Sequence, residues 1–176
     1  MKIAIYIDGS NFYFSVRKAF NSKIDIENFC KKITGENNLI KIGYYIAPVI
    51  QSSNSEMYAE QQKFFDKLKK IDKLTITLGR LEKYKKDGKL FYVEKATDIN
   101  LALDLILDAV DDRYDKAFLI SNDGDFSGAV SAVIERFKKE VVYVAVGNNK
   151  MISYHLKKVA SKTIRIDKNF IEEVKL

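Results

Sequence analysis

The sequence predicts an α/β protein with a mostly parallel sheet and helices on both of its faces. Short apolar runs rich in β-branched residues alternate along the chain with segments whose apolar residues recur at helical spacing. The run Val141 to Val146 is apolar throughout, as in strands that are buried on both faces. With 176 residues, 47% of them hydrophobic, and no repeat or linker, the chain is expected to form one domain over residues 1–176.

The first part of the chain predicts a strand followed by two helices. Lys2 to Ile7 is apolar, largely β-branched and free of turn residues, which indicates a buried strand. Gly9-Ser10 then supplies a turn and a helix cap before a helix from Asn11 to Phe20. A second helix is expected over Asp25 to Thr34, where Gly35 follows as a stop signal.

The central part predicts a strand, a helix, a strand and a hairpin. Leu39 to Ala47 is expected to be a strand that ends before Pro48, and Glu56 to Ile71 a long helix. A short strand over Leu74 to Leu78 leads into Gly79 to Ala96, which we interpret as an exposed hairpin that turns at Asp87-Gly88.

The last part returns to alternating helices and strands. Apolar residues at helical spacing predict a helix over Thr97 to Val110. The remaining expected elements are a strand at Lys116 to Ile120, a helix at Phe126 to Phe137, the strand at Val141 to Val146, a short helix at Met151 to Lys158 and a strand at Thr163 to Ile166.

Composition limits the environment and the partners of the chain. Its 30 Lys and Arg against 24 Asp and Glu give a net charge of +6, which favours a polyanionic partner, although codon bias gives the same composition. The single cysteine, Cys30, excludes an internal disulfide, and the first residues lack a signal peptide, so a cytoplasmic protein is expected. No apolar run reaches the ~20 residues that cross a bilayer, so no membrane association is expected.

Four aspartates stand just beyond a strand or at the start of a helix: Asp8, Asp98, Asp123 and Asp125. Each alone is explained as a helix cap or a first-turn carboxylate. In an open parallel sheet, however, ligands bind beyond the carboxyl ends of the strands, where Asp8 and Asp123 are expected. Clustered carboxylates repel one another, and Mg²⁺ or Mn²⁺ would stabilise them through hard oxygen ligands. A His-rich zinc site is excluded because His155 is the only histidine.

Three short motifs carry a resemblance to a known family. They are Asp8-Gly9-Ser10-Asn11, Lys95-Ala96-Thr97-Asp98 with Asp104 further on, and Ser121-Asn122-Asp123-Gly124-Asp125-Phe126. Together they resemble the NYN domain of the LabA-like group, a branch of the PIN-like nucleases, over nearly the whole chain. The resemblance implies a three-layer α/β/α PIN-like fold with about five strands in the order 3-2-1-4-5. That order makes the first and fourth strands neighbours and brings Asp8 and Asp123 together.

The resemblance also implies an activity and residues that carry it. The activity is divalent-metal-dependent hydrolysis of RNA phosphodiester bonds, with single-stranded RNA and internal cleavage favoured. Asp8, Asp98 and Asp123 would hold Mg²⁺ or Mn²⁺ and Asp125 would complete the shell, while Asn11 would orient Asp8 or contact a phosphate.

Two features of the second motif, Lys95-Ala96-Thr97-Asp98 with Asp104, depart from the pattern of the family. Many relatives have Gly-Val-Asp where this chain has Ala96-Thr97-Asp98. Asp104 lies six residues beyond Asp98, about 240° around a helix, and therefore ranks below the other aspartates as a metal ligand.

The predicted hairpin is a candidate nucleic-acid contact. Its candidate residues, together with the neighbouring lysine of the second motif, are Arg80, Lys83, Tyr84, Lys85, Lys86 and Lys95. Lysines would neutralise phosphates and aromatic rings would stack on bases. A solvated loop whose aromatic residues pack on the body is the other interpretation.

Two further functions remain open from the sequence. One is a non-catalytic module that binds RNA or a protein through the same surface. The other is a different Mg²⁺ chemistry in which an aspartate is phosphorylated, although Asp8-Gly9-Ser10 lacks a second aspartate two residues on. The chain has no Gly-rich loop ending in Gly-Lys-Ser/Thr, which disfavours nucleotide hydrolysis of the P-loop kind.

Overall fold

The computed structural model describes residues 1–35 and 37–176. The strands are β1 (Lys2–Asp8), β2 (Asn38–Ile46), β3 (Leu74–Leu78), β4 (Arg80–Lys86), β5 (Lys89–Lys95), β6 (Lys116–Ile120), β7 (Glu140–Val146) and β8 (Lys162–Ile166). The helices are α1 (Gly9–Phe20), α2 (Ile26–Thr34), α3 (Ser55–Leu68), α4 (Thr97–Val110), η1 (Gly124–Phe126, a 3₁₀ turn), α5 (Ser127–Phe137), α6 (Tyr154–Val159) and α7 (Lys168–Val174).

Six strands form one sheet in the order β3-β2-β1-β6-β7-β8, and every neighbouring pair is parallel. Without the hairpin strands β4 and β5, β6 and β7 are the fourth and fifth strands of this sheet. The predicted α/β class and the strand order 3-2-1-4-5 are therefore confirmed. The tail strand β8 extends the sheet beside β7, so the sheet has six strands rather than about five. Helix α7 was not predicted; it buries Ile171 and Val174 and so contributes to the core.

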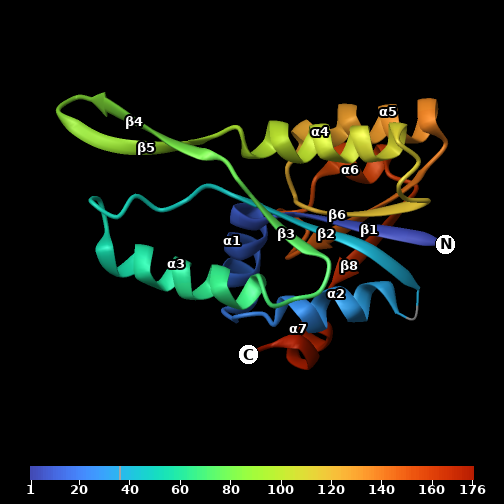
Figure 1. The fold of residues 1–176 in the computed structure, drawn as a ribbon, viewed down its shortest axis with the longest axis horizontal. Coiled ribbons are helices and arrows are strands. Elements are labelled where there is room, and N and C mark those ends of the chain that lie inside the picture. The colour runs from blue at the N-terminus through green and yellow to red at the C-terminus, as the bar shows by residue number, and fades with distance from the viewer. Residues whose placement is uncertain (36) are drawn as a thin grey trace.

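The helices cover the sheet in two layers, as Figure 1 shows, with α1, α2, α3 and α7 on one face and α4, α5 and α6 on the other. Alternation along β1 feeds both cores: Ile3, Ile5 and Ile7 pack under the first layer, and Ala4 and Tyr6 pack under the second. Burial on both faces explains why the central strands are apolar throughout.

Polar residues start most of the helices. Asp8, Asp25 and Asn54 each accept a hydrogen bond from the backbone N–H three residues on, as helix caps do. Helix α4 differs, because Ala96 precedes it in the left-handed conformation and no side chain caps it. No helix in the described part of the chain is long and apolar enough to cross a membrane.

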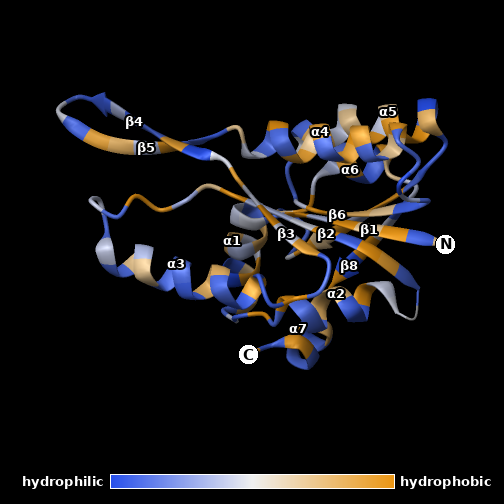
Figure 2. Cartoon of the chain, viewed as in Figure 1, coloured by the Kyte–Doolittle hydropathy of each residue, from blue (hydrophilic) through white to orange (hydrophobic). Residues whose placement is uncertain are grey.

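Strands β4 and β5 form a separate two-stranded antiparallel sheet, as predicted. Asp87 and Gly88 make its turn with φ values of 51° and 76°, the left-handed pair that tight hairpins require. The hairpin projects from the body beyond the start of α4 (Figure 1). Figure 2 shows that β4 is mostly hydrophilic and that the middle of β5 is hydrophobic.

Two glycines give a matched test of how α1 packs on the sheet. A Cβ on Gly9 would lie 2.5 Å from Tyr44 Cε1 and 2.9 Å from the Tyr45 carbonyl oxygen, whereas a Cβ on Gly128 in α5 would meet open space. We expect Gly9→Ala to lower the free energy of unfolding by roughly 1–3 kcal/mol. Gly128→Ala should raise it by about 0.5–1 kcal/mol through helix propensity. Urea unfolding followed by circular dichroism measures both, and equal effects of the two substitutions would contradict this packing.

Candidate functional site

Asp8 is the most buried carboxyl group at the carboxyl edge of the sheet, with 5% of the residue exposed. Its Oδ1 accepts a hydrogen bond from the Asn11 backbone N–H at 3.1 Å, and its Oδ2 accepts one from Ser121 Oγ at 2.8 Å. Burial raises the pKa of Asp8 to about 6; these two hydrogen bonds oppose the rise, and the charges of Asp98 and Glu94 add to it. Asp8 therefore resists ionisation more than an exposed aspartate does.

A polar network around Asn122 fixes the ends of three neighbouring strands. The Asn122 backbone N–H donates to Asn11 Oδ1 at 2.9 Å, which ties the end of β6 to the start of α1. The Asn122 side chain donates to the Val146 carbonyl oxygen at 2.6 Å and accepts from the Tyr143 hydroxyl at 2.8 Å. Asn11 thus orients Asn122 with its side chain, whereas its contact with Asp8 is through the backbone.

Asp123 follows this network and starts the 3₁₀ turn η1. Its Oδ1 accepts a hydrogen bond from the Asp125 backbone N–H at 2.9 Å, and its own N–H donates to Ser121 Oγ at 3.1 Å. Ser121 therefore contacts both Asp8 and the backbone of Asp123. The capping interpretation of Asp8 and Asp123 is correct, and the same two residues lie at the ends of adjacent parallel strands.

Asp98 stands in the first turn of α4, where the charges of several other carboxyl groups act on it. Burial raises its pKa, and the negative charges of Asp123, Glu94 and Asp125 raise it further. Ala96 takes φ 69° and ψ −11°, a conformation that glycine adopts more readily. Ala96 therefore makes a backbone turn that a glycine would favour.

Glu94 is a fifth acidic residue that belongs with the four predicted aspartates, and the sequence did not predict it. Its Oε2 accepts from Ser10 Oγ at 2.8 Å and its Oε1 accepts from the Ala47 backbone N–H at 3.1 Å, which anchors the base of the hairpin to α1 and to the end of β2. Its charge raises the pKa of both Asp8 and Asp98. The only sequence signal was an acidic residue four positions before Asp98.

The acidic cluster has no cationic partner within the described residues. We define it as Asp8, Glu94, Asp98, Asp123 and Asp125. Every ion pair between described residues involves other carboxyl groups. Among the described residues, none of the five carboxyls forms an ion pair with Lys, Arg or His, although the net charge of the chain is +6.

The donor set of the acidic cluster fits a hydrated Mg²⁺ or Mn²⁺ ion. Within residues 1–35 and 37–176, no group of three His, Cys, Asp or Glu side chains lies close enough to enclose a metal ion. Mg²⁺, however, usually keeps several waters and is held by one or two carboxylates together with substrate phosphates. Hard carboxylate oxygens without a cationic partner meet that requirement, and they do not fit a zinc site of sulfur or nitrogen ligands.

Asp104 does not join the acidic cluster. Its Oδ2 accepts a hydrogen bond from the Tyr45 hydroxyl at 2.6 Å and lies 3.3 Å from Lys41 Nζ. Lys41 also pairs with the buried Asp108 at 2.6 Å, which in turn accepts from the Tyr6 hydroxyl at 2.7 Å. Asp104 therefore belongs to an ion-pair network between α4 and β2.

The hairpin distributes its predicted contact residues over two faces. Alternation and register place Lys83 and Lys85 on the face of Glu94, opposite Tyr92 and Leu90. Arg80, Tyr84, Lys86 and Lys95 lie on the other face, where the Tyr84 ring stacks on Phe91 with centroids 5.8 Å apart. All six predicted residues are exposed, and so are the rings of Phe91 and Tyr92.

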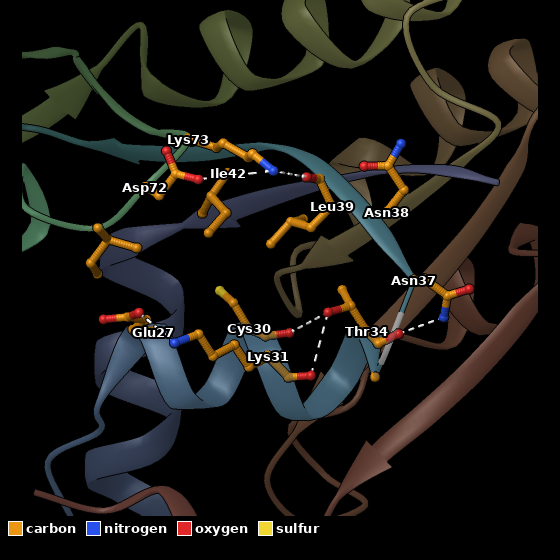
Figure 3. A pocket seen from close by; sticks show the side chains of 12 residues that line it. Glu27, Cys30, Lys31, Thr34, Asn37, Asn38, Leu39, Ile42, Asp72 and Lys73 are labelled. Atoms are coloured by element: carbon orange, nitrogen blue, oxygen red, sulfur yellow. Dashed lines mark hydrogen bonds and ion pairs between the residues drawn. The ribbon is translucent and has the colours of Figure 1, made fainter.

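One hollow of the protein lies away from the acidic cluster. It has a volume of about 290 Å³ and is lined by the end of α2, the start of β2 and the residues before β3, as Figure 3 shows. These segments are at the amino ends of the strands, the edge opposite to Asp8 and Asp123. This hollow is therefore separate from the acidic cluster.

Fold and site together define a class of protein: a three-layer α/β/α protein of the PIN-like type with an acidic cluster at the carboxyl ends of its parallel strands. The chain belongs to the NYN domain family, whose sequence model matches residues 2–167. The family prediction is confirmed, and membership of the LabA-like group within it stays a prediction. NYN domains are a nuclease-type family whose members typically use divalent metals.

The chain is similar to a solved structure over almost its full length. This is the crystal structure of a protein of unknown function, VPA0982, from Vibrio parahaemolyticus RIMD 2210633. The two share 27% identity with a TM-score of 0.75, over 99% of this chain and 96% of the other. No curated protein shows a significant match.

Because the pKa of Asp8 is raised, removing the charge of Asp8 should increase the free energy of unfolding by an amount that depends on pH. The folded protein binds the Asp8 proton more tightly than the unfolded chain does, so protonation of Asp8 stabilises the fold. This stabilisation is complete below about pH 4 and is lost as the pH rises through about 6. Without metal, Asp8→Asn should therefore raise the free energy of unfolding by roughly 1–3 kcal/mol at pH 7.5. The gain should shrink towards pH 4.5, as urea unfolding in EDTA would measure.

The matched control is Asp72→Asn, because the Asp72 side chain is 89% exposed. It should change the free energy of unfolding by less than about 0.5 kcal/mol at either pH. An Asp8→Asn effect that is the same at both pH values would contradict the assignment of a buried, destabilising charge to Asp8.

Proposed function

We propose that this protein is a divalent-metal-dependent ribonuclease that hydrolyses RNA phosphodiester bonds at the acidic cluster. The observation that carries the proposal is the gathering of five carboxyls, without a cationic partner among the described residues, at the carboxyl edge of an NYN domain. The carboxylates of such a cluster repel one another and destabilise the protein unless a bound cation compensates for their charge. The membership of a nuclease-type family makes metal-dependent hydrolysis the function that best explains it.

Asp8, Asp98, Asp123 and Asp125 are the residues that would hold Mg²⁺ or Mn²⁺. A bound divalent cation supplies activation of water for attack and stabilisation of the charge that develops on the phosphate. The protein's own contribution is to position these carboxyls. Ser121 does so by contacting Asp8 and Asp123, and Asn122 does so by joining the ends of β6 and β7.

Asn11 and Lys95 are the candidate phosphate contacts nearest to the acidic cluster. The Asn11 side-chain oxygen is used by Asn122, while its amide group donates no hydrogen bond to any described residue and can donate to a phosphate. Lys95 ends β5 three residues before Asp98, is exposed, and forms no ion pair within the described ranges. Both would position the substrate and stabilise negative charge on it.

The hairpin would hold single-stranded RNA next to the acidic cluster. The face that carries Glu94 continues outward through Lys83 with Tyr92 and then Lys85 with Leu90. Lysine contacts to phosphates and an exposed tyrosine ring for base stacking are the usual elements of single-strand binding. An RNA held there can extend past the open site, which favours cleavage of internal bonds. We place this activity in the cytoplasm, in keeping with one buried, unbonded cysteine, Cys30.

Cleavage of a labelled single-stranded RNA with Mn²⁺ or Mg²⁺ tests the proposal. We expect Asp98→Asn and Asp123→Asn to lower the rate by at least ~100-fold, because loss of one carboxylate weakens both the binding of the cation and its placement. EDTA should abolish cutting and added Mn²⁺ should restore it. A DNA of the same sequence, run in parallel, decides between RNA and DNA as substrate.

Asp104→Asn is the matched control, since it removes one carboxylate from the same helix as Asp98 but outside the acidic cluster. It should keep most of the activity. If the Asp98 and Asp123 variants cut as well as the wild type, or if none of the proteins cuts while all bind RNA equally, the catalytic proposal fails. The second outcome would favour the non-catalytic RNA-binding module.

A further inference from the structure

A second hollow of about 260 Å³ lies where the carboxyl ends of β7 and β8 meet the end of α1. Its lining includes Lys18 from α1, Gly147 and Asn148 after β7, Arg165 near the end of β8, and Lys168 at the start of α7. None of these residues was a candidate in the sequence analysis. We call this feature the basic hollow.

The basic hollow carries an excess of positive charge. Lys18, Arg165 and Lys168 are exposed and take part in no ion pair between residues that the structure describes. Arg165 Nη1 donates to Asn149 Oδ1 at 2.8 Å, a bond to a neutral group that leaves its charge uncompensated. The one acidic residue of the lining, Asp167, uses its Oδ1 to accept from the Phe170 backbone N–H.

Hydrogen bonds connect the basic hollow to the acidic cluster. Gly147 follows Val146, whose carbonyl oxygen accepts from the side chain of Asn122, and Asn122 immediately precedes Asp123. The two sites also occupy the same edge of the sheet, because β6, β7 and β8 are consecutive parallel strands. Two strand spacings separate β6 from β8, a distance of about 10 Å.

The order of charges along this edge is therefore basic, acidic, basic. The hairpin with Lys83 and Lys85 is anchored through Glu94 at the end of β2, the acidic cluster lies at β1 and β6, and the basic hollow lies at β7 and β8. A strand of nucleic acid that crosses the acidic cluster must bring its phosphates close to carboxylates, which repel them. Basic contacts on both sides would compensate for that repulsion.

We propose that the basic hollow binds phosphate groups of the RNA on the side of the scissile bond away from the hairpin. The inference rests on the proposed function, because it takes the acidic cluster as the place of cleavage. Arg165 suits this role, since a guanidinium binds two phosphate oxygens at once, and Lys18 and Lys168 add point charges. Contacts to phosphates hold the strand in register and do not read its sequence.

Binding of a labelled single-stranded RNA in EDTA, measured by fluorescence anisotropy over a series of salt concentrations, tests this proposal without cleavage. The test variant is the triple substitution Lys18→Ala, Arg165→Ala, Lys168→Ala. The control variant, Lys31→Ala, Lys69→Ala, Lys70→Ala, removes the same charge from exposed residues at or near the opposite edge of the sheet. Thermal unfolding of both variants checks that they are folded.

We expect the test variant to bind RNA about 10- to 100-fold more weakly than the wild type, and the slope of log K against log salt to fall by about 2, since each phosphate contact on a single strand contributes ~0.7. The control variant should change affinity by less than about threefold. Equal effects of the two variants, or an unchanged salt slope, would overturn the proposal. Weakened binding of inorganic phosphate with unchanged RNA affinity would overturn it too, by making the hollow a site for free anions.

The outcome is separable from that of the proposed function. A wild type that binds RNA through the basic hollow but never cuts it leaves the phosphate site in place and removes the nuclease. A wild type that cuts RNA, with cutting and binding unchanged in the test variant, removes the phosphate site alone.

Discussion

The site depends on one topological constraint, the direct pairing of β1 with β6. Because both strands run in the same direction and pair up to Ile7 and Ile120, the next residues, Asp8 and Ser121, face each other and are hydrogen-bonded at 2.8 Å. The side chain of Asn122 extends this connection to β7. Parallel order thus brings together polar residues that are more than a hundred positions apart in the chain, and the buried apolar strands hold them there.

The carboxyl groups at this edge destabilise the folded state. Asp8 is buried and has a raised pKa, and the pKa of Asp98 is raised by burial and by its acidic neighbours. Glu94 adds a further negative charge while it anchors the hairpin. Strain at Ala96 is found in the same place. Destabilising features that gather at one point of a fold are typical of functional sites, because a bound ligand compensates for them there. The basic residues on both flanks make a phosphate-bearing ligand the natural candidate.

Local patterns made much of the fold predictable. Apolar runs and caps located the strands and most helix starts, because these signals are local in the sequence. The lower rank of Asp104 as a metal ligand stays a prediction, and the structure places its carboxylate with Tyr45 and Lys41. The strand order needed the family resemblance, since nothing in the residues states which strands pair. Glu94 and the basic hollow were missed for the same reason: the hairpin must fold back before Glu94 reaches Ser10, and Lys18 meets Arg165 only through the packing of α1 near β8. The tail strand β8 was predicted near its observed place, but its pairing with β7 and the helix α7 after it come from tertiary packing.

Binding of a divalent cation by the acidic cluster can be observed in a crystal of the wild-type protein soaked in Mn²⁺, with anomalous scattering collected above and below the manganese edge. We expect an anomalous peak beside the carboxyl groups of Asp8, Asp98 and Asp123, with further ligands supplied by water, and its loss in crystals of Asp123→Asn. A wild-type crystal with Mn²⁺ bound only at other carboxyls, such as Asp104 or Asp108, or with no bound Mn²⁺, would contradict it.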